Sequence, residues 1–246
     1  MLRGALWVLL ALFTTAVVAV GGLWVWAGSE GSLATALRWA GERQPLAAEG
    51  VAGTLRQGGA VGRLAWETGE LVVEARDVRL KWQPWALLSG QLQLDNVSAS
   101  SLRVHDRRAP APPSGPPVAI VLPVKLVLDE FTLGRFDWVG PPAFTATNIA
   151  GKYEYNGVQH SVQLDSLQVA SGRYAGRAAL GARAPLELSA QLSGTVTTAG
   201  PGGNALPLSF TAQASGPLTD LRAQASLQAG SATSSTLPQP RARAAA

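Results

Sequence analysis

Apolar and polar residues alternate along most of the chain, and in several stretches this alternation slips by one residue. In the first such stretch, residues 73–80, the alternation breaks at Arg76 and Asp77 and resumes at Val78. Strict alternation places the apolar side chains on one face of a β-strand. A slip of one residue turns the later side chains to the opposite face unless a β-bulge or a bend absorbs it. The pattern therefore predicts strands that are bent at defined points.

The slip recurs four more times, each time around a pair of residues that includes an aspartate. The later pairs are Asp95-Asn96, Asp129-Glu130, Asp165-Ser166 and, in a weaker copy, Thr219-Asp220. The copies begin at residues 73, 92, 126, 162 and 216, so their starts lie 19, 34, 36 and 54 residues apart. These steps are close to multiples of roughly 18 residues, which is typical of a repeat architecture. We therefore expect a mainly β fold, built as a curved, repetitive antiparallel sheet.

Two β-repeat sections are predicted, 46–106 and 118–230. The first holds predicted strands at 71–75, 78–82, 91–97 and 102–104, and Trp82 and Trp85 are expected to anchor its core. Residues 107–117 are rich in proline and are expected to form a stiff linker or a long loop between the sections. In the second section, Asn156 and Gly157 predict a hairpin turn. We expect each repeat aspartate to bond its own backbone at a bulge.

An unbroken apolar run extends from Leu6 to Ala27 without a charged residue. Such a run is long enough to cross a hydrocarbon core, so residues 6–27 are expected to form a single transmembrane anchor after a cytoplasmic N-terminus at 1–5. Leu6 begins this anchor, and Trp7, Trp24 and Trp26 are its expected interfacial residues. A cleavable signal peptide is the alternative, although its apolar region is normally shorter. Both interpretations place the chain beyond residue 28 outside the cytoplasm.

A short helix and a connector are expected at 28–45. Ser32 is positioned to cap a helix over 33–40 that Gly41 ends. This helix would pack on the first strands, or it would cover an exposed end of the sheet or lie on a membrane surface. At the other end, residues 231–246 lack periodicity, and we expect a disordered tail at a truncated end.

Composition narrows the class of protein. Apolar residues make up 47% of the chain and charged residues 15%, which is too apolar for a disordered chain. The net charge of +4 comes from scattered residues, so no nucleic-acid partner is expected. Cysteine is absent, and the two histidines, His105 and His160, lie far apart in sequence. With no phosphate loop or nucleophile elbow either, we expect no catalytic residue, metal site or cofactor, and no enzyme.

The chain also resembles a known family. After the N-terminal apolar run and short helix come "VAGTL", "LVVEARDVRLKWQPWALLSGQLQLDNVSASSLRV", a proline-rich break and "LPVKLVLDEFTL". "SGRYAGRAAL", "APLELSAQLSGTV" and "LPLSFTAQASGPLTDLRAQASLQA" follow. This order resembles the N-terminal part of the TamB family (translocation and assembly module subunit), among the AsmA-like, bridge-like lipid transfer proteins. The resemblance extends over nearly all of residues 1–230.

The resemblance implies a single-pass protein of the bacterial inner membrane with its bulk in the periplasm. Its fold would be a half-open β-tube, or taco, whose hydrophobic groove carries phospholipid between the inner and outer membranes. The implied partner is an outer-membrane barrel protein of the TamA or BamA type. Family members are several times longer, and the C-terminal domain that meets the barrel has no counterpart here.

Two functions remain open at this point. In a lipid conduit, one apolar face of each strand would line a groove, and the candidate lining is Val78, Leu80, Leu92, Leu94, Leu126, Leu128, Val162 and Leu164. The same residues would instead form a dry core if the fold were a closed sandwich. In the alternative function, a scaffold assists the insertion of outer-membrane proteins, or secretion, by pairing its open sheet edge with their strands, without lipid transport.

Overall fold

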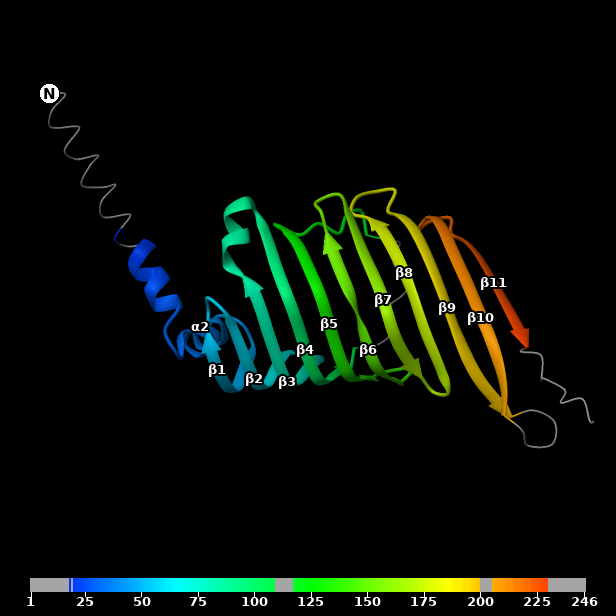
Figure 1. Cartoon of the computed structure of the whole chain (residues 1–246), viewed down its shortest axis with the longest axis horizontal. Coiled ribbons are helices and arrows are strands. Elements are labelled where there is room, and N and C mark those ends of the chain that lie inside the picture. The colour runs from blue at the N-terminus through cyan, green and yellow to red at the C-terminus, as the bar shows by residue number, and fades with distance from the viewer. Residues whose placement is uncertain (1–17, 19, 109–116, 200–204, 230–246) are drawn as a thin grey trace, which may run out of the picture.

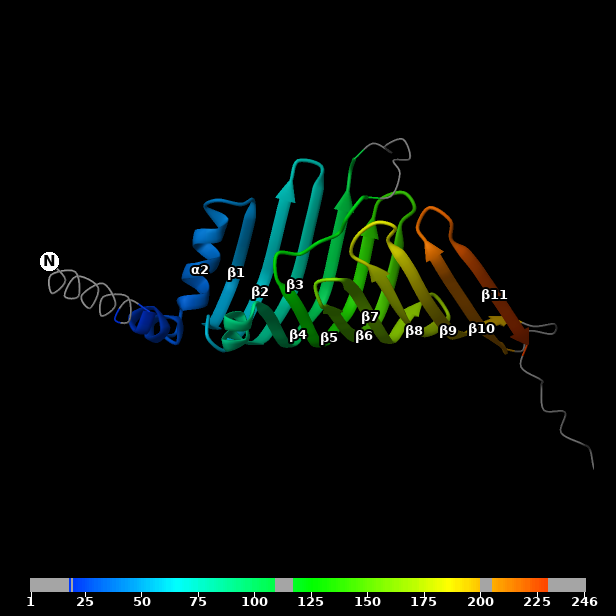
Figure 2. The ribbon, with the colours of Figure 1, turned by 90° about the horizontal axis from the view of Figure 1, so that it is seen from above.

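Figure 1 shows the computed structural model, which describes residues 18, 20–108, 117–199 and 205–229. All strands of the described residues belong to one 11-stranded sheet, in which each strand lies beside its neighbours in sequence from β1 to β11. The sheet is a single curved layer that remains open between its first and last strands (Figures 1 and 2). The predicted mainly β fold with one curved sheet is therefore confirmed.

The strands are long, and most are joined by short connections. Their bounds are β1 Leu46–Thr54, β2 Gly58–Thr68, β3 Leu71–Gln83, β4 Gln91–Asp106, β5 Lys125–Val139, β6 Phe144–Tyr155, β7 Gln159–Val169, β8 Gly172–Gly181, β9 Glu187–Ala199, β10 Ala205–Pro217 and β11 Arg222–Ala229. Helix α2 spans Ser32–Gly41, and the 3₁₀-helix η1, Pro84–Ser89, joins β3 to β4. The predicted strands 71–75 and 78–82 are one strand, β3, and those at 91–97 and 102–104 are both part of β4.

One pair of strands departs from the predicted antiparallel sheet. β4 and β5 are parallel, with Leu92 opposite Leu126 and Leu94 opposite Leu128. The cause is the connection between them, about 18 residues from Arg107 to Val124, which returns the chain to the end where β4 began.

The proline-rich segment is therefore a crossover, and the two predicted β-repeat sections form one continuous sheet. Residues 109–116 lie outside the described part. Residues 117–124 do not yet form a strand, because β5 begins only at Lys125. They run beside the β8–β9 connection instead: the Ile120 N–H donates to the Ala182 carbonyl at 2.8 Å, and the Ala184 N–H donates to the Val118 carbonyl at 2.9 Å.

The predicted bulges are present as register shifts in three of the five copies, and in a fourth, at Asp77, the register does not shift. The β5–β6 register shifts between Leu128 and Phe131, and the β7–β8 register shifts between Leu164 and Leu167. The β3–β4 register shifts between Lys81, which pairs with Asn96, and Trp82, which pairs with Leu94. Asp77 in β3 adopts a left-handed conformation with φ 50°. Bulges add bending and twist, which fits the curvature of the sheet.

The fifth copy was interpreted wrongly as a bulged strand. Thr219 and Asp220 lie in the turn between β10 and β11, where the Asp220 N–H donates to the Pro217 carbonyl at 2.8 Å. The hairpin predicted at Asn156 is present between β6 and β7. There the Asn156 Oδ1 accepts from the N–H groups of Val158 and Gln159, at 3.0 and 2.9 Å.

Helix α2 lies against β1, the first strand of the sheet (Figure 2). Leu33 packs so closely over Gly59 that a Cβ at Gly59 would lie 2.8 Å from the Leu33 Cδ2 atom. Ser32 begins the helix and does not cap it, contrary to expectation. Its Oγ donates to the Ala27 carbonyl and accepts from the Leu55 N–H, both at 3.0 Å, and so fixes the helix to the sheet.

Residues 20–27 are helical and precede α2 by a short turn. Most of the predicted anchor, including Leu6 and Trp7, lies outside the described residues, as does the predicted tail. Within the described part of the chain, no helix is both long enough and apolar enough to cross a membrane.

Candidate functional site

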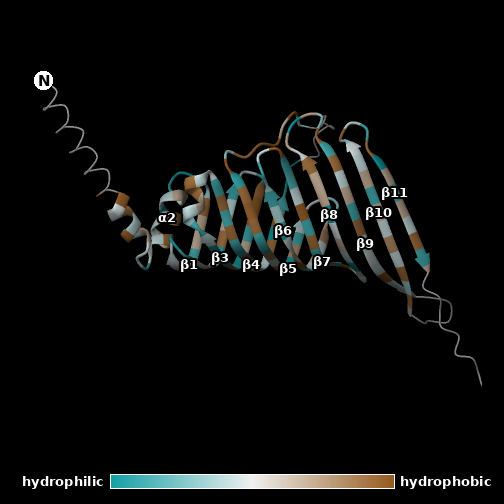
Figure 3. Cartoon of the chain, turned by 45° about the horizontal axis from the view of Figure 1, so that its top comes forward, coloured by the Kyte–Doolittle hydropathy of each residue, from teal (hydrophilic) through white to brown (hydrophobic). Residues whose placement is uncertain are grey.

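The bulges keep the apolar side chains of successive strands on one face of the sheet, which we call the apolar face. One row of directly opposed residues crosses the sheet from β3 to β11. It consists of Trp82, Leu94, Leu128, Tyr153, Val162, Ala178, Ala190, Ala214 and Ala223. Figure 3 shows hydrophobic and hydrophilic bands alternating along the strands, as expected when alternate residues face opposite sides.

The eight predicted lining residues all lie on this apolar face. Leu80 and Leu164 belong to a second row, in which Leu80 opposes Val97, Val97 opposes Phe131, and the row continues through Gly151 to Leu164. Leu92 and Leu126 oppose each other in a third row. Val78 lies two positions before Leu80 and opposes Val61 of β2. The structure therefore brings together residues from β3, β4, β5 and β7.

These residues are not the core of a closed sandwich. All eight are half-buried, and none is fully buried. The described strands form a single layer, and the described helices pack on it mainly at β1, β2 and β4. A closed sandwich would bury such leucines completely between two layers about 10 Å apart. The apolar face is thus left without a covering layer across most of the described sheet.

A hollow of about 430 Å³ lies on the apolar face between β7 and β11. Its apolar wall includes Val162, Leu164, Ala178, Ala190, Leu192 and Ala212. The sequence-based selection ended at Leu164 and missed the alanines, because alanine alternation is a weak signal in a chain so rich in alanine. The hollow exists because β8 to β11 carry small side chains at the positions where β4 and β5 carry leucines.

Aromatic side chains on the apolar face were also missed. Tyr155 stacks on His160, with ring centroids 4.5 Å apart, and is only 1% exposed. The His160 Nδ1 lies 2.7 Å from the Tyr153 Oη, and its Nε2 lies 2.7 Å from the Ile120 carbonyl oxygen. The crossover segment at Ile120 therefore lies on the apolar side of the sheet, beside the start of β7. Burial raises the pKa of Tyr153, with a smaller contribution from Tyr155.

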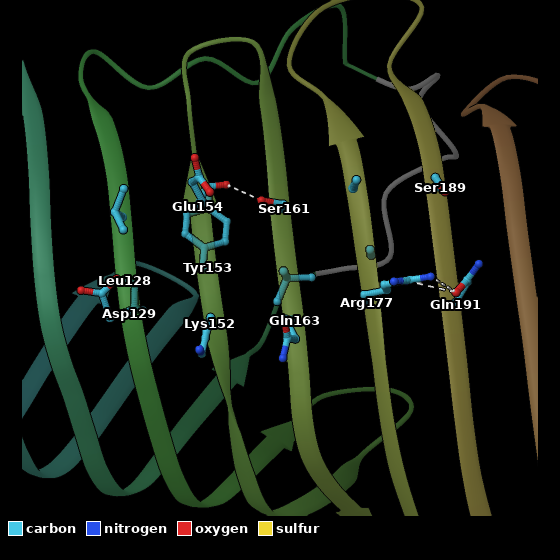
Figure 4. Close-up of a pocket in the computed structure, with 14 residues that line it drawn as sticks. Leu128, Asp129, Lys152, Tyr153, Glu154, Ser161, Gln163, Arg177, Ser189 and Gln191 are labelled. Atoms are coloured by element: carbon cyan, nitrogen blue, oxygen red, sulfur yellow. Dashed lines mark hydrogen bonds between the residues drawn. The ribbon is translucent and has the colours of Figure 1, made fainter.

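The opposite face of the sheet is polar. A row of Lys152, Gln163, Arg177, Gln191, Gln213 and Gln224 crosses it from β6 to β11. Figure 4 shows part of this row, in which the Arg177 guanidinium donates to the Gln191 Oε1 at 2.8 Å. A hollow of about 520 Å³ lies here, but its charged and amide side chains do not favour an apolar ligand.

The repeat aspartates accept hydrogen bonds from side chains of the polar face. We had expected them to bond their own backbones, and this prediction was wrong. Asp95, Asp129 and Asp165 accept hydrogen bonds from Gln83, Gln93 and Gln163, at 2.6, 2.6 and 2.7 Å. Asp77 accepts from the Ser100 Oγ at 2.7 Å. Each of these four aspartates thus has a polar partner on the polar face. These hydrogen bonds help to determine which residues of the strand face the polar side.

Ion pairs also contribute to the polar face. Asp137 is 8% exposed, and its carboxylate accepts hydrogen bonds from the Arg135 Nε at 2.8 Å and the Thr145 Oγ1 at 2.8 Å. These bonds, the one from Arg135 first, lower the pKa of Asp137. Hydrogen bonds from Arg76 and Arg63 lower the pKa of Glu74 in the same way. All these charges lie away from the apolar face.

The two tryptophans expected in the core have different surroundings. Trp82 lies on the apolar face, and its indole N–H donates to the Leu55 carbonyl at 2.7 Å. Trp85 was assigned wrongly to the core, because it lies on η1 and is 63% exposed. Of the predicted anchor residues, Trp24 and Trp26 lie on the helix at 20–27, and Trp24 contacts Trp85 with ring centroids 4.1 Å apart.

Comparison of the chain with protein-family models, with curated proteins and with solved structures returned no match.

Proposed function

We propose that this protein carries phospholipid along the apolar face of its sheet, as a membrane-anchored bridge of the kind that the TamB-like sequence pattern implies. Residues 6–27 would hold it in the inner membrane, and the sheet would extend into the periplasm toward the outer membrane. The observation that carries the proposal is the row of apolar side chains from β3 to β11 with little cover over it.

The physical reason is the cost of exposing an acyl chain to water, about 0.8 kcal/mol for each CH₂ group. Half-buried leucines on one face offer apolar contacts along the direction in which the strands stack. Lipid headgroups would remain in solvent above the open side of the sheet. A single apolar layer can also accept acyl chains without opening a closed core.

A charge on the apolar face tests this proposal. Leu94→Asp and Leu128→Asp should lower the amount of phospholipid that copurifies with the full chain by about tenfold or more, since a charge beside acyl chains costs about 3 kcal/mol. Ser98→Asp is the matched control, because Ser98 lies on the polar face of β4 opposite Arg79. Equal phospholipid in all three folded variants and the unchanged protein would exclude transport on the apolar face.

The second candidate is a scaffold that pairs with strands of outer-membrane proteins. It is favoured by β11, whose residues Arg222–Ala229 are all exposed and pair with β10 alone in the described sheet. Lysine on an edge strand discourages pairing. Ser226→Lys, on the polar face, should therefore impair outer-membrane protein assembly and leave copurified phospholipid unchanged if the scaffold is the function. The lipid conduit predicts that this substitution changes neither.

A further inference from the structure

The 3₁₀-helix η1 exposes apolar side chains where a strand connection would normally be polar. Leu88 is 83% exposed, Trp85 is 63% exposed, and Leu87 is also exposed. No residue of η1 is buried. These side chains therefore do little for the packing of the β3–β4 connection.

The apolar surface of η1 continues onto a segment that is distant in sequence. Trp85 contacts Trp24, near the end of the helix at 20–27, and Figures 1 and 2 show η1 at the same end of the sheet as that helix. On this helix, Leu23 is exposed, and Val25 is 72% exposed. Two chain segments thus form one apolar surface, which we call the η1 surface.

Amphipathic and basic groups border the η1 surface. The Arg56 guanidinium lies 5.3 Å from the ring centroid of Trp24, and a cation in this position is attracted by the aromatic face. Trp39 stacks on Trp26, with centroids 5.7 Å apart, and is itself half exposed. Tryptophans beside a basic group are typical of segments at the boundary between lipid headgroups and acyl chains.

We propose that the η1 surface inserts into the outer leaflet of the bilayer that holds residues 6–27, as a second membrane contact. The occupant is a lipid surface because the η1 surface is continuous with the end of the 22-residue apolar run at 6–27, of which residues 6–17 and 19 lie outside the described part. The Arg56 guanidinium is placed to bind a lipid phosphate. This inference rests on the proposed membrane anchor, and it places the end of the apolar face at the membrane surface.

The chain has no cysteine, so a single introduced cysteine can report on this contact. We would label Leu88→Cys with an environment-sensitive fluorophore in the full chain, reconstituted in vesicles of phosphatidylethanolamine and phosphatidylglycerol. The matched control is Val158→Cys, an exposed apolar site in the β6–β7 turn that is 76% exposed. We expect blue-shifted emission and quenching by spin-labelled lipids at residue 88, and neither at residue 158.

Emission from residue 88 that matches residue 158, in vesicles where the chain resists alkaline extraction, would overturn the inference. Quenching at residue 88 with no lipid on the apolar face would leave the η1 contact in place and would contradict the proposed lipid transport. In the double variant Trp85→Ser with Leu88→Ser, a photoreactive amino acid at position 94 should form severalfold fewer phospholipid adducts, while the chain stays in the membrane. An unchanged yield of adducts would contradict the placement of the end of the apolar face at the membrane surface.

Discussion

His160 holds the crossover segment at Ile120. Its Nε2 lies 2.7 Å from the Ile120 carbonyl oxygen, which can only accept, so Nε2 carries a proton. In the neutral ring, Nδ1 is then the acceptor for the Tyr153 hydroxyl at 2.7 Å. One histidine of β7 thus joins the apolar face of the sheet to a segment that arrives from the end of β4.

Removal of the imidazole should loosen the crossover. We expect His160→Ala to lower the stability of the segment at 118–121 by about 1–2 kcal/mol, because two hydrogen bonds are lost. The Ile120 amide, which donates to Ala182 of the β8–β9 connection, and the Ala184 amide of that connection, which donates to Val118, should then exchange hydrogen faster. The readout is hydrogen exchange followed by mass spectrometry, and His105→Ala in β4 is the control. Unchanged exchange at Ile120 would show that His160 does not hold the crossover.

Asp77 should tolerate asparagine and little else. Its φ of 50° is unfavourable for most side chains, and aspartate and asparagine adopt it more readily. We expect Asp77→Ala to cost about 1–2 kcal/mol, since both this tolerance and the hydrogen bond from Ser100 are lost. Asp77→Asn should stay within about 0.5 kcal/mol of the unchanged protein in urea unfolding. If both variants unfold alike, the backbone at this position does not depend on the side chain.

Asp137 should make the fold sensitive to acid. Its pKa is lowered in the folded chain, so its ionised form stabilises the fold above the unfolded pKa near 4. This contribution is lost as the pH falls through the lower, folded pKa. Asp137→Asn should cost about 1 kcal/mol at neutral pH, allowing for the exposed arginine, and should flatten the acid dependence of stability below about pH 4.

Asp106 provides the comparison for that measurement. Hydrogen bonds from Arg108 lower the pKa of Asp106 to about 2, but the Arg108 side chain is 59% exposed. Ion pairs of this kind contribute little to stability. Asp106→Asn should therefore leave the thermal unfolding curve nearly unchanged across the same pH range, and a larger loss than that of Asp137→Asn would contradict this assignment.

The local pattern of the sequence was sufficient to predict the bulges. At Asp129 and Asp165 the alternation slips within a strand, and the structure has a register shift at both positions. The shared face of the eight lining residues follows from the same pattern. The direction of β5 does not, because alternation is the same in a parallel and an antiparallel strand.

Two other features depended on contacts that alternation does not encode. Thr219 and Asp220 match the repeat, but Pro217 ends β10 just before them, and they form a turn. Trp85 was expected in the core because tryptophan is large and apolar, whereas η1 carries it outward beside Trp24. Its neighbours Leu87 and Leu88 were the available signal, since three apolar residues near one another in a short connection are unusual.

Photo-crosslinking in cells tests the central proposal most directly. A photoreactive amino acid would replace Leu80, Leu94 or Leu128 on the apolar face, with Arg79 and Gln93 on the polar face as controls. We predict phospholipid adducts at the three leucine positions and none at the controls. An absence of adducts at all five positions, with the protein intact in the membrane, would contradict lipid transport along the apolar face.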